Sequence, residues 1–346
     1  LSLIYCAGHL SLFLDDTRLG LIFGLTLIAI GSGGIKPSIA SNVGDQFSQA
    51  NRHLLSRAFS WYYFGINIGS STSSLMTPWL LQNYGPSVAF GVPGIFMLLA
   101  TVTYWLGRNK FVHVPPAGKS YIEDLMGSEG QRVAKRLLVI YLLIAAFWSL
   151  FDQMGSTWVI QAQSLNREIF GYEMLPAQIQ AANPFLILIL IPIFSYIVYP
   201  FMGRFFRVTT KRKMCIGMFL AATPFLVTAW IETQLLNGLI PHIGWQLLAY
   251  FLLTTAEVML IVTCLEFSYT QAPQKMKSFV MAFFYLSISA GNLFTALVNQ
   301  IIQRPDGSSF LGGAMYHLFF AGFMGFFAVL FFIYMRYYQE EYIIQE

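Results

Sequence analysis

The sequence has few charged residues, and this scarcity excludes an ordinary water-soluble domain. Asp, Glu, Lys and Arg make up 10% of the 346 residues, whereas a soluble domain carries roughly 25%. Hydrophobic residues make up 56%. Because a chain with so little polar surface cannot cover itself in water, we expect an all-α protein embedded in a membrane.

Cysteine and histidine are also scarce, which leaves little material for disulfide or metal chemistry. The three cysteines, Cys6, Cys215 and Cys264, stand apart in apolar segments, where isolated cysteines behave as small core residues. The five histidines are scattered, and the sequence has no His-Glu-x-x-His motif, nucleophile elbow or Walker lysine. We therefore expect neither an enzyme nor a protein with a metal or organic cofactor.

Long stretches without any charge predict helices that span a bilayer. The runs 58–107, 174–203, 278–303 and 307–335 contain no Asp, Glu, Lys or Arg, and a spanning helix needs roughly 20 apolar residues. The first run is long enough for two helices separated by a turn. Hydropathy and turn signals together predict ten segments, the first of them partial. They are 1–13, 19–40, 57–81, 87–106, 137–163, 177–203, 214–235, 244–270, 278–301 and 311–337.

Most of the 20 Lys and Arg residues fall on one face of this array, and this sets its orientation. That face is formed by the C-terminal tail and the connectors 41–57, 107–136, 204–213 and 271–277. The opposite face holds only Arg18, Arg167 and Arg304. The positive-inside rule therefore predicts a multi-pass protein of the cytoplasmic membrane with its C-terminus in the cytoplasm. The same placement explains the basic pI without a nucleic-acid partner.

The connectors also predict how the segments are grouped. The chain opens with Leu1 inside an apolar segment, so we expect further residues before it. The 107–136 connector carries Pro115, Pro116 and Gly118, which is typical of a flexible linker. The expected parts are the remainder of an N-terminal helical bundle at 1–106, a cytoplasmic linker at 107–136 and a C-terminal six-helix bundle at 137–346.

Four ionisable side chains stand out inside the predicted spans, where a charge costs a few kcal/mol or more unless it faces a partner or a water-filled cavity. They are Lys36, Asp152, Glu257 and Glu266. An internal salt bridge is the alternative for each, and it is strongest for Asp152 and Glu257, which could lock or gate the helices. Lys36 could instead extend its ammonium toward the cytoplasm.

The two glutamates can be compared by their positions on one helix. Glu257 and Glu266 lie nine residues apart, which puts them on opposite faces of a regular α-helix. Glu266 shares its face with Thr263 and Thr270 and so forms a polar stripe. We therefore expect Glu266, rather than Glu257, to line a cavity.

Other polar groups extend the candidate set. Tyr63 and Asn67 stand four residues apart and share one helical face, and Asn183 opens a later span. Trp148 lies one turn before Asp152, where it could stack on a ligand or simply pack in the core. The glycines that precede Lys36 permit close helix packing, which accounts for most of them.

Several long blocks of sequence resemble the proton-dependent oligopeptide transporter (POT/PTR) family of the major facilitator superfamily. The blocks are GSGGIKP at 31–37, GDQF at 44–47, FSWYYFGINIGS at 59–70, FWSLFDQ at 147–153, and EFSYTQAP at 266–273 followed by MKS at 276–278. They occur in the family's order and cover nearly the whole chain. The resemblance implies two six-helix bundles around a central cavity, of which this chain would lack the first two helices and begin in the third.

The resemblance also implies a function, namely proton symport of di- and tripeptides by a bacterial type of transporter. By the matched motifs, Lys36 and Tyr63 would bind the peptide carboxylate, and Trp148 would line the cavity. The peptide amine would meet Asn67, Asn183 and Glu266, with Thr270 beside Glu266. Lys36 and Glu266 would also take part in proton coupling. The implied partners are the peptide, protons and the lipid bilayer.

The sequence departs from the family pattern at a few points. The Glu-x-x-Glu-Arg motif of the family's first helix is absent because that helix is absent. Ser71 replaces an aliphatic residue, Phe284 replaces a family tryptophan, and the 107–136 connector is too short for the two extra helices of many bacterial members. Two other functions remain open from the residues alone. One is a carrier of nitrate or another small solute with the same fold, and the other is a membrane receptor that does not transport.

Overall fold

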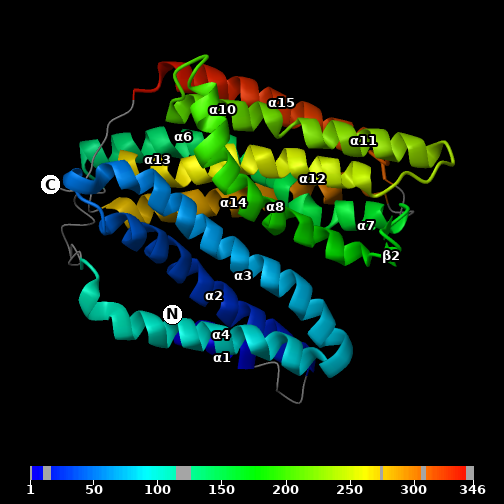
Figure 1. Cartoon of the computed structure of the whole chain (residues 1–346), viewed down its shortest axis with the longest axis horizontal. Helices are drawn as coiled ribbons and strands as arrows, with labels where there is room; N and C mark the ends of the chain where they lie inside the picture. The colour runs from blue at the N-terminus through cyan, green and yellow to red at the C-terminus, as the bar shows by residue number, and fades with distance from the viewer. Residues whose placement is uncertain (1, 11–16, 114–125, 273–275, 305–308, 340–346) are drawn as a thin grey trace.

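The computed structural model describes residues 2–10, 17–113, 126–272, 276–304 and 309–339, and most of this length is helical (Figure 1). The α-helices are α1 (Ser2–Leu10), α2 (Thr17–Asp45), α3 (Leu55–Tyr84), α4 (Pro86–Gly107), α6 (Ser128–Phe151), α7 (Thr157–Gln163), α8 (Ala182–Ile193), α9 (Tyr199–Met202), α10 (Thr210–Leu220), α11 (Thr223–Leu236), α12 (Gly244–Glu257), α13 (Thr263–Gln271), α14 (Lys277–Ile302) and α15 (Ala314–Tyr337). Short 3-10 helices are η2 (Gln49–Leu54), η3 (Arg108–Lys110), η4 (Asp152–Gly155) and η5 (Pro176–Ala181). Two π-helical turns are η6 (Phe194–Val198) and η7 (Val258–Val262), and the strands β1 (Glu168–Ile169) and β2 (Tyr172–Glu173) form a small antiparallel hairpin.

These helices confirm the ten predicted segments, each of which coincides with one helix or with consecutive helical pieces. Within the described part of the chain, eight helical stretches are long and apolar enough to cross a membrane. A helix suits that environment because it satisfies its backbone N–H and C=O groups internally, where no water can. α3 is also long enough, at 30 residues, and it carries polar residues along one face. Residues 11–13 of the first segment and 114–125 of the linker lie outside the described residues.

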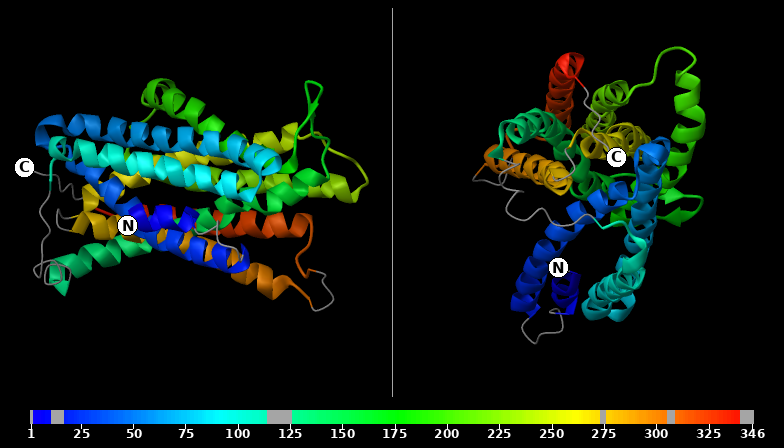
Figure 2. Two further views of the ribbon diagram at one scale, coloured as in Figure 1. Left: turned by 90° about the horizontal axis from the view of Figure 1, so that it is seen from below. Right: turned by 90° about the vertical axis from the view of Figure 1, so that its left-hand side faces the viewer.

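The helices fall into two groups, which Figures 1 and 2 show from three sides. α1 to α4 pack on one another, and α6 to α15 form the larger group. The groups meet where α2 packs against α14 and where α3 runs beside α8. The polar residues predicted to form a site are therefore carried by the helices along this junction.

The larger group is held together by close helix contacts. α6 and α14 make an extensive contact, and Gly291 of α14 lies directly on α6. A Cβ atom at this position would come within 2.4 Å of the Ala145 carbonyl oxygen and 2.7 Å of the Ser149 nitrogen. Only glycine fits at this approach, as is common where membrane helices pack without a hydrophobic driving force between them.

Two spans contain a π-helical turn between α-helical pieces. In the first, η6 follows Pro192, which lacks a backbone N–H and interrupts the hydrogen-bond ladder of α8. In the second, η7 lies between Glu257 and Thr263. An extra residue in a helical turn changes the direction of every side chain that follows, and π-turns are frequent at functional sites.

Candidate functional site at the junction of the two helix groups

The carboxylate of Glu257 lies at the junction of the two groups and is hydrogen-bonded from both. It sits at the last residue of α12 and is 2% exposed. The Tyr63 hydroxyl of α3 donates to Oε1, and the Asn183 amide of α8 donates to Oε2 at 2.8 Å. Asn183 also donates to Thr254 Oγ1 at 3.0 Å. The partners of Glu257 are thus neutral donors, one of which comes from the other group of helices.

A second set of charges lies beside this carboxylate. Asp152, at the junction of α6 and η4, accepts a hydrogen bond from the Asn292 amide of α14. The Asp152 carboxylate interacts electrostatically with the Lys36 ammonium of α2 and with Glu257. The Lys36 side chain is exposed. We call Lys36, Tyr63, Asp152, Asn183 and Glu257 the central site.

Two of the predicted residues flank the central site without a side-chain contact to Glu257. The Asn67 amide is buried and donates to the Tyr63 carbonyl oxygen at 2.9 Å, within its own helix. Trp148 is 6% exposed and packs edge-on against Phe151 and Phe284, so its ring lies in the core beside Asp152.

Glu266 is not brought together with Tyr63 or Asn183. It lines a separate cavity of about 370 Å³ between α3, the α8–η6–α9 span, α10 and the α12–η7–α13 span, which we call the vestibule. Thr263 also lines the vestibule, but the buried Thr270 hydroxyl bonds to the Phe267 carbonyl oxygen of its own helix.

The prediction that Glu266 lines a cavity is confirmed, but the sequence argument missed the hydrogen bonds that Tyr63 and Asn183 make to Glu257. The sequence argument placed the two carboxylates on opposite faces of a regular α-helix. The π-helical turn η7 lies between them and reduces the rotation from one to the other. As a result Glu257 bonds to α3, and Glu266 faces a cavity walled by α3 as well.

The ends of α2, α13 and α14 are in contact on the side that carries the basic connectors. The Tyr269 hydroxyl donates to Asp45 Oδ1 at 3.0 Å, and the buried Lys277 ammonium lies 3.7 Å from the centre of the Tyr269 ring. Ser41 and Ser278 share a hydrogen bond of 3.0 Å. Gly44 lies against Tyr269, because a Cβ there would come within 2.2 Å of the ring. The two groups are thus closed against each other at this end.

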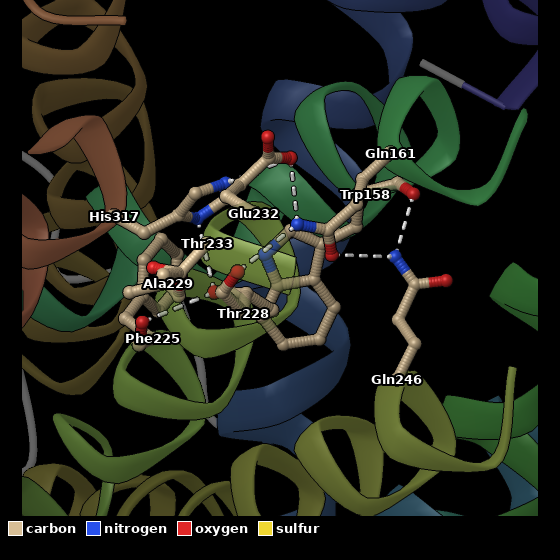
Figure 3. Close-up of polar contacts among 9 residues, drawn as sticks. All are labelled: Trp158, Gln161, Phe225, Thr228, Ala229, Glu232, Thr233, Gln246 and His317. Carbon is tan, nitrogen blue, oxygen red and sulfur yellow. Dashed lines mark hydrogen bonds and ion pairs between the residues drawn. The ribbon is translucent and has the colours of Figure 1, made fainter. Parts of the chain in front are cut away.

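A buried polar cluster near the opposite end of the larger group was not predicted (Figure 3). Gln161 of α7 donates to Glu232 Oε1 at 2.8 Å and to the Thr228 carbonyl oxygen at 3.1 Å. His317 of α15 bonds to the Thr228 hydroxyl at 3.0 Å and lies 3.9 Å from Glu232, and Gln246 of α12 donates to Gln161. The cluster joins α7, α11, α12 and α15. The sequence signals were His317, a titratable group inside the charge-free run 307–335, and Glu232, a carboxylate inside the predicted span 214–235.

The described residues do not bring together three or more His, Cys, Asp or Glu side chains that could hold a metal ion. The three cysteines are free and buried, as predicted for small core residues. The side chains of the central site offer fixed charges and hydrogen bonds. A buried anion, a nearby cation and amide donors can bind a small molecule that carries both charges.

Comparison with known proteins shows which family this sequence matches. The profile of the POT family (PTR2) matches residues 1–128 and 124–316. Solute carrier family 15 member 2 of Rattus norvegicus is 33% identical over 293 residues, which cover 69% of this chain and 40% of that protein. Peptide transporter family 1 of Drosophila melanogaster is 33% identical over 282 residues, covering 68% of this chain and 38% of that protein. The chain thus spans about two fifths of the length of these relatives.

Two solved structures share the fold over most of their length. The crystal structure of an auto-inhibited POT family peptide transporter has a TM-score of 0.80 at 33% identity, covering 99% of this chain and 82% of that one. The POT family transporter PepTSo has a TM-score of 0.79 at 35% identity, covering 97% and 82%. These matches confirm the major facilitator fold and the resemblance drawn from the sequence blocks. The chain belongs to the POT family of membrane transporters.

Proposed function

We propose that this protein is a proton-coupled symporter that imports di- and tripeptides by alternating access. The observation that carries the proposal is the buried Glu257 carboxylate between the two helix groups, with the Lys36 ammonium nearby. A peptide is a zwitterion, so one fixed anion and one fixed cation on opposite groups would orient it. The printed names of the relatives, several of which are peptide transporters, support the same substrate class.

The proposed roles follow from the placement of the side chains. Glu257 and Asn183 would receive the peptide amine, and Lys36 would receive the carboxylate. Tyr63 would hold Glu257 while the site is empty. Asn67 and Trp148, one turn from Tyr63 and Asp152 respectively, would complete the wall. Recognition through the two termini alone would leave the side chains of the peptide unconstrained.

Proton coupling is assigned in this proposal to the central site rather than to Glu266. Glu257 and Asp152 are two carboxylates that interact with each other, and Lys36 interacts with Asp152. Two anions and one cation leave a surplus negative charge, which a proton would neutralise at low cost. A peptide amine that reaches Glu257 would change this balance, so that proton and peptide occupancy depend on each other.

Alternating access would use the contact between the ends of α2, α13 and α14. In the structure this end is closed by Asp45, Tyr269 and Lys277, so the central site would be open toward the other side of the membrane. The positive-inside rule places the closed end and the C-terminus in the cytoplasm. The protein would then lie in the cytoplasmic membrane, surrounded by lipid, with no role for nucleic acid.

Uptake of labelled dialanine into proteoliposomes, with and without an inward proton gradient, tests the proposal. We expect accumulation above the external concentration only with the gradient, and uptake that falls as external pH rises from acid to neutral. Nitrate in excess should not compete. Absence of gradient-driven accumulation, or a flat pH profile, would contradict proton-coupled peptide symport.

A further inference from the structure

The vestibule is a cavity with charged and hydroxyl side chains in its wall that do not belong to the central site. It carries both signs of charge, with Arg57 of α3, Lys213 of α10 and Glu266 of α13 in its wall. Its wall also includes the small hydroxyl side chains Ser56, Ser60 and Ser195. The cavity lies at the end of the molecule that the proposed orientation places in the cytoplasm.

The charges in the vestibule are held close enough to influence one another. Lys213 Nζ lies 4.2 Å from the centre of the Tyr199 ring and interacts electrostatically with Glu266. Arg57 is exposed and can turn into the cavity. One anion and two cations in the wall of one cavity match a ligand that has an ammonium at one end and a carboxylate at the other.

The vestibule is connected to the central site along one face of α3. Ser56, Ser60, Tyr63 and Asn67 follow each other at intervals of three or four residues, so they form a continuous polar stripe. Tyr63 belongs to the central site, and Ser60 and Ser56 line the vestibule. The stripe therefore leads from the vestibule toward the central site.

An apolar layer lies between the central site and the vestibule. It consists of buried residues around the two π-helical turns, and Tyr63 and Phe64 pack against it. Its members are Ile187, Leu190, Ile191, Phe194, Val258, Met259 and Val262. Val258 follows Glu257 directly in the chain and also lines the vestibule, so the layer is thin at this point.

We propose that the vestibule is a second binding site for the zwitterionic peptide, occupied after the central site and before release to the cytoplasm. The peptide ammonium would bind Glu266, and the carboxylate would bind Arg57 and Lys213. This inference rests on the proposed peptide symport and adds a release step to it. The π-helical turns would let the apolar layer between the central site and the vestibule rearrange as the peptide passes.

The test compares the two sides of the membrane in Glu266→Gln. Efflux from right-side-out vesicles preloaded with dialanine gives the internal dialanine concentration at which efflux is half-maximal. Uptake into the same vesicles gives the external dialanine concentration at which uptake is half-maximal. We expect the internal value to rise about tenfold, the loss typical of one charge-assisted hydrogen bond, and the external value to stay within about twofold. Arg207→Gln, an exposed charge change outside the vestibule at the same end, should alter neither value.

Chemically blocked peptides identify which end binds where. Internal N-acetyl-dialanine should compete equally in wild type and Glu266→Gln, because it has no ammonium to lose. Internal dialanine amide should compete equally in wild type and Arg57→Gln. A Glu266→Gln effect that appears only in liposomes containing phosphatidylethanolamine would show that a zwitterionic lipid occupies the vestibule, and would overturn the proposal.

Equal changes on both sides, or no change on either, would also overturn the second site. Wild-type vesicles that neither take up nor release dialanine would contradict the proposed symport instead. The two ideas therefore fail by different results. Thermal unfolding in detergent would show whether Glu266→Gln, which keeps the shape of the side chain, remains folded.

Discussion

Substitution of Glu257 by glutamine gives the sharpest test of the central site. The carboxylate accepts hydrogen bonds from Tyr63 and from Asn183, whereas a glutamine amide has one accepting oxygen and one donating nitrogen. Glu257→Gln therefore loses one of these bonds and the full charge that would hold a peptide ammonium. A hydrogen bond to a charged group contributes about 1.5–3 kcal/mol, so the dissociation constant for dialanine should rise about 10- to 150-fold.

Binding of labelled dialanine to the purified protein measures this change, with N-acetyl-dialanine as an unlabelled competitor. Because the acetylated peptide has no ammonium, its affinity should change little in Glu257→Gln. Glu168→Gln, which removes an exposed carboxylate on the β1 strand, is the matched control and should bind both peptides as wild type does. An equal loss for both peptides would show that Glu257 only supports the fold, and no loss would place the amine elsewhere.

Tyr63→Phe separates the charge from the hydrogen bond that crosses the junction. It keeps the Glu257 carboxylate and the Asn183 bond but removes the donor on α3. The ammonium no longer has to displace Tyr63, so dialanine affinity should stay the same or rise, in contrast to Glu257→Gln. An affinity loss as large as that of Glu257→Gln would assign Tyr63 a direct part in binding.

Three other substitutions test the packing that supports the site. Gly44→Ala places a methyl group 2.2 Å from the Tyr269 ring, so in the Ser278→Cys protein the cysteine should react faster with an impermeant maleimide added from the cytoplasmic side. Gly33→Ala, whose methyl meets nothing within 4 Å, should leave the rate unchanged. Equal rates in Ser278→Cys alone and with either glycine change would contradict the closed contact. Gly291→Ala overpacks α6 against α14 by about 1–3 kcal/mol and should lower the melting temperature, whereas Gly325→Ala should not. Gln161→Leu removes the donor to Glu232 and to Thr228, which costs about 1–3 kcal/mol, and an unchanged melting temperature would show that the cluster does not stabilise the bundle.

Sequence reasoning predicted the helices because their cause is local. A charge-free run of 20 or more residues has few alternatives to a spanning helix, and glycine and proline mark its ends. The same reasoning found Lys36, Tyr63 and Asn183, since a polar group among apolar ones is visible without any structure. It missed the bond between Glu257 and Tyr63 because the π-helical turn η7 depends on how the helix packs against its neighbours.

The polar cluster around Gln161 and Glu232 could not be predicted for a different reason. Its members come from four helices that are distant in the sequence, and glutamine and threonine are common at helix ends. Only the three-dimensional arrangement shows that Gln246 donates to Gln161 and that Gln161 donates to the Glu232 carboxylate. Networks of this kind depend on the mutual position of several helices, which hydropathy does not contain.

The hydrogen bond between Tyr63 and Glu257 links ligand binding to the contact between the two helix groups. A ligand can shift a conformational equilibrium only by binding one arrangement more tightly than the other. In the structure Glu257 accepts a bond from α3, and a peptide ammonium that takes this place would remove one tie across the junction. The contact of Asp45 with Tyr269 would then hold the closed end with less support. A change that weakens the closed end shifts the same conformational equilibrium, so Gly44→Ala should change dialanine binding although Gly44 lies outside the central site.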